Sequence, residues 1–137
     1  MSLDLTTLAA TVQSLPPDKQ KEAIDLIGRI SGIKVKELAQ GDFLAFVKEV
    51  WPAFIEGQHH KIMADAFNRI ADGTLKRLIV NMPPRHTKSE FASHLFPAWY
   101  LGRFPDKKVI QTAHTAELAV GFGRKVRNLV GSEAYQQ

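Results

Sequence analysis

The chain has 137 residues, enough for one domain with a hydrophobic core. Its 45% hydrophobic and 23% charged residues are ordinary for a globular protein, and no apolar run approaches the roughly 20 residues that span a bilayer. The sequence contains no cysteine, which excludes disulfides, thiolate metal sites and thiol nucleophiles. No basic segment followed by an apolar stretch begins the chain, so we expect no secretory signal.

The net charge of +4 is unevenly distributed. Residues 1–56 hold 6 Lys and Arg against 8 Asp and Glu, a net charge of −2, whereas residues 57–137 hold 12 against 6, a net charge of +6. A basic second part suits a polyanionic partner such as a nucleotide or a nucleic acid. It is explained equally well by a solvated basic face.

Two helices are predicted in the first part of the chain. The first carries apolar residues at helical spacing: Leu5, Leu8, Val12 and Leu15. Pro16-Pro17 ends it, and a second apolar stripe follows: Ala23, Leu26, Ile27 and Ile30. Gly32 is expected to end this second helix, so residues 4–31 are predicted to form an αα-hairpin. We interpret residues 1–42 as a helical appendage for packing or interaction.

Further helices are predicted over residues 43–50 and from Gln58 to Ala71, with Gly73 placed where a C-terminal glycine belongs. Residues 78–80 and 109–113 are short, apolar, partly β-branched runs, and they predict two buried strands.

Two more helices follow these runs. One is expected to begin near Lys88 and to end or kink at Pro97. The last is expected to be capped by Thr115 and closed by Gly131. A strand, a helix and a second strand in this order imply parallel strands with a right-handed crossover.

The turn before Lys88 holds the chemically most informative residues, because Met82–Ser89 reads MPPRHTKS. Compared with the phosphate-binding pattern GxxxxGK[ST], it keeps Lys88 and Ser89 and has Met82 and Thr87 in place of the two glycines. A helix N-terminus attracts anions through its free N–H groups, Lys88 can reach the β- and γ-phosphates, and Ser89 can place its hydroxyl on Mg²⁺. Arg85 adds a bidentate donor.

Position 87 decides how tight this loop can be. If it requires a positive φ, a β-branched residue there costs roughly 1–2 kcal/mol. The alternative interpretation is an ordinary strand-to-helix turn with Ser89 at its cap.

The segment Leu78–Glu90, LIVNMPPRHTKSE, closely resembles the Walker A region of phage large terminases, which often reads PPRHGKS. Residues 97–99 and 102–106 resemble the family's PAW and GR.PD segments, and residues 108–112 and 119–127 are similar to its next strand and helix. The similarity covers roughly residues 43–137.

The resemblance implies an α/β fold, namely a partial RecA-like (ASCE) P-loop NTPase core with parallel strands over residues 43–137, preceded by the helical segment 1–42. It implies ATP and Mg²⁺ as cofactors. The parent protein would be a large terminase subunit that pumps double-stranded viral DNA into a procapsid, as a ring on the portal in the host cytoplasm. The small terminase subunit is the further implied partner, no membrane is involved, and family members also carry a nuclease domain.

Carried onto this sequence, Lys88 and Ser89 match the phosphate and Mg²⁺ contacts of the family. Arg85 matches the loop arginine that senses or stabilises the γ-phosphate. The remaining residues of the implied nucleotide-binding loop are Pro84, His86, Thr87 and Glu90.

Two outlying positions complete the implied site. Gln58 and His59 match the family region that contacts adenine, although an exposed polar helix start explains Gln58 equally well. Arg124 and Arg127 lie off the apolar stripe of the last helix, and Arg124 is a candidate trans-acting arginine finger. A solvated helix face is the alternative.

A Walker B strand, an apolar run followed by Asp and Glu, does not occur after Ala113 or elsewhere in the sequence. We therefore expect the chain to bind nucleotide phosphates without hydrolysing ATP or cutting DNA by itself, and we hypothesise that it is a fragment of a longer protein. Two alternatives stay open, namely another P-loop translocase or helicase, and a non-catalytic assembly or binding module.

Overall fold

The computed structural model describes residues 11–136. Its contacts divide the chain into two units, Met1–Val35 and Lys36–Gln137, and each is described by itself. The structure is 67% helical, and residues 11–136 contain no strand. None of the helices in that range combines the length and apolarity needed to cross a membrane.

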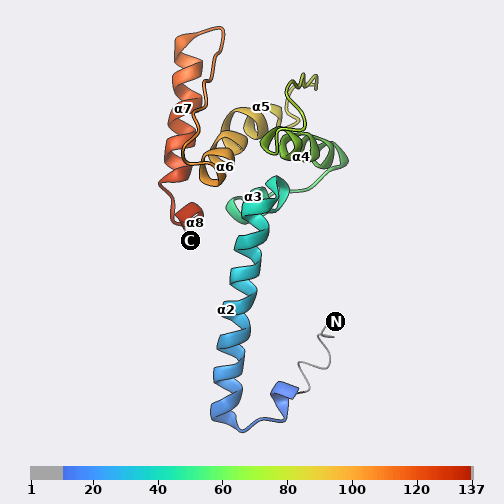
Figure 1. The fold of residues 1–137 in the computed structure, drawn as a ribbon, viewed down its shortest axis with the longest axis vertical. Coiled ribbons are helices and arrows are strands. Elements are labelled where there is room, and N and C mark those ends of the chain that lie inside the picture. The colour runs from blue at the N-terminus through green and yellow to red at the C-terminus, as the bar shows by residue number, and fades with distance from the viewer. Residues whose placement is uncertain (1–10, 137) are drawn as a thin grey trace. The chain divides into compact units, whose positions relative to one another are not determined.

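The first unit contains most of helix α2, Pro17–Gly41 (Figure 1). The prediction that Gly32 ends this helix is wrong, because α2 continues for nine residues beyond it. A glycine inside a helix costs about 1 kcal/mol relative to alanine, which good helix formers after it can offset. The apolar stripe of α2 is exposed at Leu26, Ile27 and Ile30. Most of the first helix of the predicted hairpin lies outside the described residues.

The second unit is built from short helices (Figure 1). They are α3 (Phe43–Val50), α4 (Gln58–Ala71), α5 (Lys88–Glu90), the π-helical turn η1 (Phe91–Leu95), α6 (Phe96–Arg103), α7 (Ala116–Val130) and α8 (Glu133–Gln136). The predicted helices over 43–50 and 58–71 are confirmed, and Gly73 has the positive φ of 77° expected after a helix. Thr115 caps α7 as predicted, accepting the N–H of Leu118.

The core of this unit is centred on Phe43, which is fully buried. Its ring meets the rings of Phe67, Phe91 and Phe96 nearly edge-on at centroid distances of 5.3, 5.4 and 5.9 Å. Trp99 lies 5.5 Å from the same ring, and its Nε1 donates to the Ala39 carbonyl at 2.9 Å. Edge-to-face aromatic pairs add to the stabilisation from burial, so one side chain joins α3, α4, η1 and α6.

The predicted α/β fold is wrong, because the described residues contain no RecA-like core of parallel strands. Residues 78–80 and 109–113, predicted as buried strands, are extended segments outside any ladder. Ile79 is 85% exposed and Ile110 is 90% exposed. An apolar run becomes a strand only by pairing its backbone with another strand, and the packing partners in this unit are helices.

Pro97 does not end the helical segment that begins at Lys88, because α6 runs on to Arg103. Of the two predicted outcomes, an end or a kink, the first is therefore wrong. Proline has no N–H to offer the carbonyl four residues earlier, which is that of Ser93. The side-chain amide of Gln111 donates to this carbonyl instead, at 2.7 Å. The wider η1 turn directly before α6 includes Ser93, so the freed acceptor lies within a π-bulge and is satisfied from another segment.

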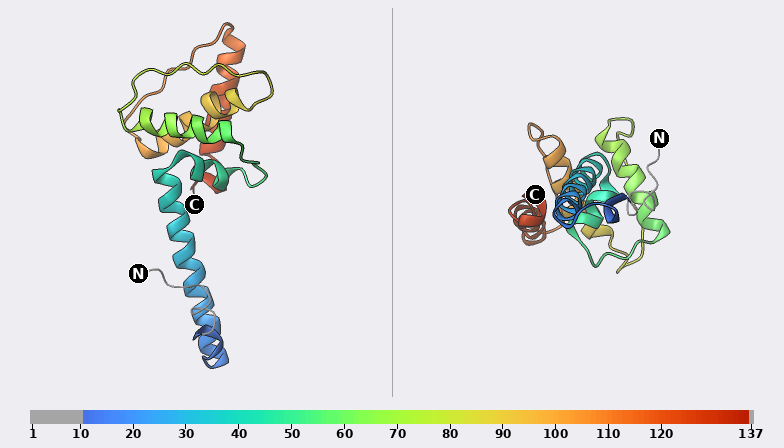
Figure 2. Two further views of the ribbon diagram at one scale, coloured as in Figure 1. Left: turned by 90° about the vertical axis from the view of Figure 1, so that its right-hand side faces the viewer. Right: turned by 90° about the horizontal axis from the view of Figure 1, so that it is seen from below.

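The chain between α4 and α5 returns along α4 towards the beginning of that helix (Figure 2). At one end of this return, Leu75 N–H donates to the Arg69 carbonyl at 3.0 Å. At the other end, Thr87 meets His60, which lies in the first turn of α4. The segment therefore brings the turn around Lys88 to the start of α4.

Candidate phosphate-binding site

The backbone of the turn before α5 has an unusual conformation. Arg85 has φ of 65° and Thr87 has φ of 56°, and these are the non-glycine residues with positive φ in residues 11–136. Thr87 directly precedes Lys88 and occupies the position of the second glycine in the phosphate-binding pattern. A β-branched residue in this region costs roughly 1–2 kcal/mol, so other contacts must hold it there.

His60 makes one such contact. Its Nε2 lies 2.6 Å from the Thr87 hydroxyl, and its Nδ1 accepts the backbone N–H of Gly57 at 2.9 Å. Because Nδ1 is an acceptor, the neutral ring carries its proton on Nε2 and donates it to Thr87. The Thr87 hydroxyl in turn donates to the His86 carbonyl at 2.7 Å. The first turn of α4 is thus linked to the loop by consecutive hydrogen bonds.

His60 is 5% exposed and lies close to the rings of Phe54 and Phe91, at 4.8 and 5.0 Å. Burial lowers the pKa of His60 below its usual value of 6.5. The neighbouring His59 and His86 lower this pKa further, and the carboxylate of Glu56 opposes them. The ring is therefore neutral at physiological pH, as its hydrogen bonds require.

A helical segment begins at the end of the loop. α5, η1 and α6 follow one another without a break from Lys88 to Arg103. Its first amide groups have no acceptor inside the helix, and the helix dipole favours an anion beside them. Lys88 is half-buried and Ser89 is exposed, and they are the first two residues of this helical segment, so a cation and a hydroxyl belong to the same turn as the free amide groups. These are the groups that a phosphate requires.

Glu90 connects the same turn to α7. Its Oε1 lies 2.5 Å from Nδ1 of His94, and its Oε2 lies 3.0 Å from Nζ of Lys125. Burial would raise the pKa of Glu90, but the hydrogen bonds from His94 and Lys125 outweigh it and hold that pKa below its usual value. Glu90 is thus an ionised partner of two side chains, and its role in nucleotide binding stays a prediction.

A pocket of about 530 Å³ opens beside the loop. Apolar side chains from the end of α3, from η1 and from α7 line it together with polar ones from the loop and the helical segment after it. They are Val50, Trp51, Arg85, Thr87, Glu90, His94, Leu95 and Leu129. The predicted residues Arg85 and Thr87 therefore line a hollow large enough for part of a small ligand.

The other predicted residues lie at varying distances from this loop. His86 donates from Nδ1 to the Pro84 carbonyl at 2.9 Å, and its ring centroid lies 5.8 Å from that of His59. The structure therefore brings His59 to the loop. Gln58 is exposed at the first residue of α4. Arg124 is exposed on α7, as expected for an arginine finger and equally for a solvated helix face.

Sequence reasoning missed His60, His94 and Lys125. Glu90 and His94 are four residues apart in the helix predicted to begin near Lys88, and this spacing could have indicated their contact. The contact between His60 and Thr87 joins residues 27 positions apart, and no local pattern predicts it.

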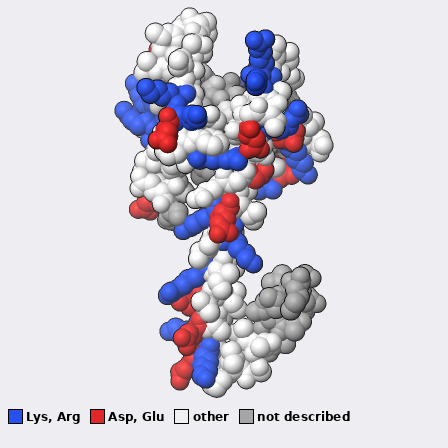
Figure 3. Space-filling view, in the orientation of Figure 1, with Lys and Arg blue, Asp and Glu red and all other residues white. Residues whose placement is uncertain are grey.

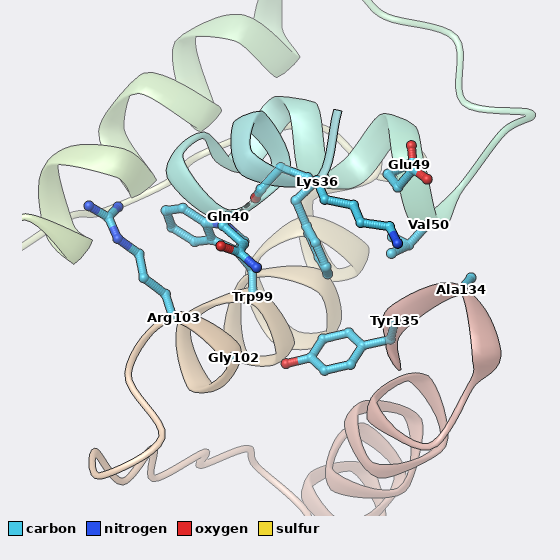
Figure 4. A pocket seen from close by; sticks show the side chains of 11 residues that line it. Lys36, Gln40, Glu49, Val50, Trp99, Gly102, Arg103, Ala134 and Tyr135 are labelled. Atoms are coloured by element: carbon cyan, nitrogen blue, oxygen red, sulfur yellow. Dashed lines mark hydrogen bonds between the residues drawn. The ribbon is translucent and has the colours of Figure 1, made fainter. Parts of the chain in front are cut away.

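A second pocket, of about 190 Å³, lies away from the loop and is drawn in Figure 4. Arg103 lies at one end of it and Ala134 at the other. Tyr135 hydroxyl donates to the Ala98 carbonyl at 2.8 Å, so this polar group is already satisfied. Nη2 of Arg103 donates to Asp72 at 2.8 Å, whereas its buried Nη1 has no partner. The lining holds no helix N-terminus with a lysine, in contrast to the loop.

The charge distribution and the candidate metal ligands do not point to a second site in the described residues. On the face drawn in Figure 3, Lys and Arg side chains form separate groups with Asp and Glu between them. Residues 11–136 contain no group of three or more His, Asp or Glu side chains placed to hold a metal ion. Comparison with protein-family models, curated proteins and solved structures finds no match to this chain.

Proposed function

We propose that the chain binds the phosphates of a nucleotide, with ATP and Mg²⁺ as the expected ligands, through the loop from Pro83 to Ser89. The observation that carries this proposal is the left-handed backbone of Thr87 immediately before Lys88. Glycine, which the phosphate-binding pattern has at this position, adopts this conformation readily, and here a threonine adopts it.

The chemistry of the loop supports the same ligand. Lys88 supplies a cation and Ser89 an exposed hydroxyl that can reach Mg²⁺. Arg85, also exposed, supplies a bidentate donor for a terminal phosphate. The first amide groups of the helix add donors at fixed positions.

The larger assembly is part of the proposal and is supported by the resemblance to phage large terminases of residues 78–90, 97–99, 102–106, 108–112 and 119–127. On that basis the chain is the nucleotide-binding part of a large terminase subunit, which packages double-stranded viral DNA at the portal in the host cytoplasm. The small terminase subunit and further copies of the same subunit are the expected partners. Hydrolysis would require water-activating residues that the sequence of this chain does not contain.

The test is calorimetric titration of Mg-ATP into the chain and into Lys88→Ala. Loss of a charge-assisted contact of about 1.5–3 kcal/mol predicts roughly 10- to 100-fold weaker binding. Lys108→Ala removes the same charge from an exposed extended segment and should bind like the unaltered chain. Equal, negligible binding by all three proteins would contradict the proposal and favour a non-catalytic assembly module.

A further inference from the structure

We propose that α2 is a dimerisation surface, on which α2 of a second copy of this chain packs in antiparallel orientation. The exposed apolar residues of α2 show that the helix has a face to bury, and the order of the charges along it identifies the second copy as the occupant. No residue of the phosphate loop takes part, so dimerisation is independent of nucleotide binding.

One side of α2 carries apolar residues at alternating spacings of three and four. They are Ala23, Leu26, Ile30 and Ile33, which follow the heptad period of a coiled-coil seam. Leu26 is 57% exposed, Ile30 is 46% exposed and Ile33 is 56% exposed. Because an amphipathic helix gains most of its stability by burying such a stripe, the seam of α2 requires a partner.

Charged residues continue the same heptad positions beyond both ends of this seam. Lys19 lies seven residues before Leu26, and Glu37 lies seven residues after Ile30. Both charged side chains are exposed. The seam therefore begins with a cation and ends with an anion.

These two end charges oppose a parallel dimer. In a parallel coiled coil that is in register, residues of the same number meet across the seam. Lys19 would then face a second Lys19 at one end, and Glu37 would face a second Glu37 at the other. Like charges would meet at both ends of the seam, and such contacts are unfavourable.

The antiparallel orientation suits both the apolar and the charged positions. When Leu26 packs opposite Ile30 of the second copy, the small side chain of Ala23 meets a larger isoleucine. The same register places Lys19 opposite Glu37 at each end of the seam. A single register therefore buries the apolar side chains together and pairs opposite charges.

The residues that flank the seam agree with the antiparallel register. Glu22 falls opposite Lys36 of the second copy, on both sides of the dimer centre. Arg29 lies nearest the centre and meets its own counterpart there, but its charge is already paired with Asp25 of the same helix at 2.8 Å. In the parallel arrangement Arg29 would instead face Lys34 of the second copy.

The first experiment is sedimentation equilibrium of the full chain over a range of protein concentrations. We expect a reversible equilibrium between monomer and dimer, because the seam is short. Ile30→Lys buries a charge in the middle of the seam and should weaken dimerisation by more than about tenfold. Val35→Lys adds the same charge to an exposed position of α2 outside the seam, and it should dimerise like the unaltered chain. Circular dichroism confirms that both variants are folded.

The second experiment exchanges the two end charges and tests the orientation. Lys19→Glu alone, or Glu37→Lys alone, places like charges at both ends of an antiparallel seam, and each should weaken dimerisation by about two- to tenfold. The double variant restores opposite charges and should dimerise like the unaltered chain. In a parallel dimer like charges would meet before and after each exchange, so none of these variants would change the affinity.

Three results would overturn the proposal. One is a chain that stays monomeric at every concentration, because the stripe of α2 would then be covered by another part of the chain or by a different protein. Another is a dimer that Ile30→Lys leaves intact, which would place the interface elsewhere. The third is a dimer that Ile30→Lys disrupts but that the single charge exchanges do not weaken, which would refute the antiparallel orientation.

Discussion

The helical core around Phe43 and the extended segments 74–87 and 104–115 obey different rules of folding. In the core, each helix satisfies its own backbone hydrogen bonds and buries an apolar face against the next helix. In the extended segments no ladder forms, and Ile79 and Ile110 are almost fully exposed, whereas their neighbours Leu78, Val80 and Met82 are only partly buried against the core. An apolar pattern therefore defines a helix by itself, whereas it defines a strand only when a partner strand is present.

The largest effect is expected in the core. Phe43→Ala removes a fully buried ring that four other aromatic rings contact, and it should lower the free energy of unfolding by about 3–5 kcal/mol. Ile110→Ala, on an extended segment, should change it by less than about 0.5 kcal/mol because the side chain is already in water. Urea denaturation measures both. If Phe43→Ala and Ile110→Ala lowered the free energy of unfolding by similar amounts, the core and the extended segments would not differ as described.

A smaller effect on stability is expected at Gln111, whose side chain on an extended segment donates to a helix carbonyl. Gln111→Ala leaves the Ser93 carbonyl without its donor and should cost about 1–2 kcal/mol. Thr112→Ala, at the next and exposed position, serves as the matched control and should cost little. If Gln111→Ala is as neutral as the control, Pro97 is accommodated by the wider turn alone.

The free energy of unfolding should fall in two steps as the pH is lowered, one from His60 and one from Glu90. The pKa of His60 is lowered in the folded protein, so the unfolded chain takes up this proton first, and stability is lost as pH falls below about 6.5. The pKa of Glu90 is also lowered, so its contribution is present above about pH 4.5 and is lost as pH falls further. Urea denaturation at several pH values should show the upper step disappear in His60→Gln and the lower one in Glu90→Gln. If the upper step remained in His60→Gln, or the lower step in Glu90→Gln, another titrating group would be responsible for that step.

The smallest effect is expected at the contact between α5 and α7. Lys125→Met removes the half-exposed partner of Glu90 and should cost less than about 1 kcal/mol, because surface ion pairs contribute little. Raising the salt concentration in the unaltered chain should reproduce most of this loss. A loss of several kcal/mol would show that this ion pair is shielded from solvent.

The predictability of the fold from sequence follows the same division. The boundaries of α4 and the cap of α7 were predicted because Gly73 and Thr115 act on the residues next to them. The strands were predicted from short apolar runs whose pairing depends on distant chain, and that prediction was wrong. The helix end predicted at Pro97 does not occur for a related reason, because the carbonyl that Pro97 leaves without a donor is satisfied by Gln111, fourteen residues later.

The candidate site shows the same limit. Lys88, Ser89 and Arg85 were identified from their order in the sequence, and the expected strain at Thr87 is present as a positive φ. His60 was not identified, because its contact with Thr87 exists only after the chain has returned along α4. The contacts of Glu90 with His94 and Lys125 are likewise not given by its place in the motif.

The most direct test of phosphate binding is an NMR titration that follows the backbone amides while Mg-ATP is added. We predict that the largest chemical-shift changes fall between Arg85 and Glu90, where the helix amides face the proposed phosphate, and that they vanish in Lys88→Ala. Changes confined to residues around Trp99 and Tyr135, or no changes at all, would contradict it.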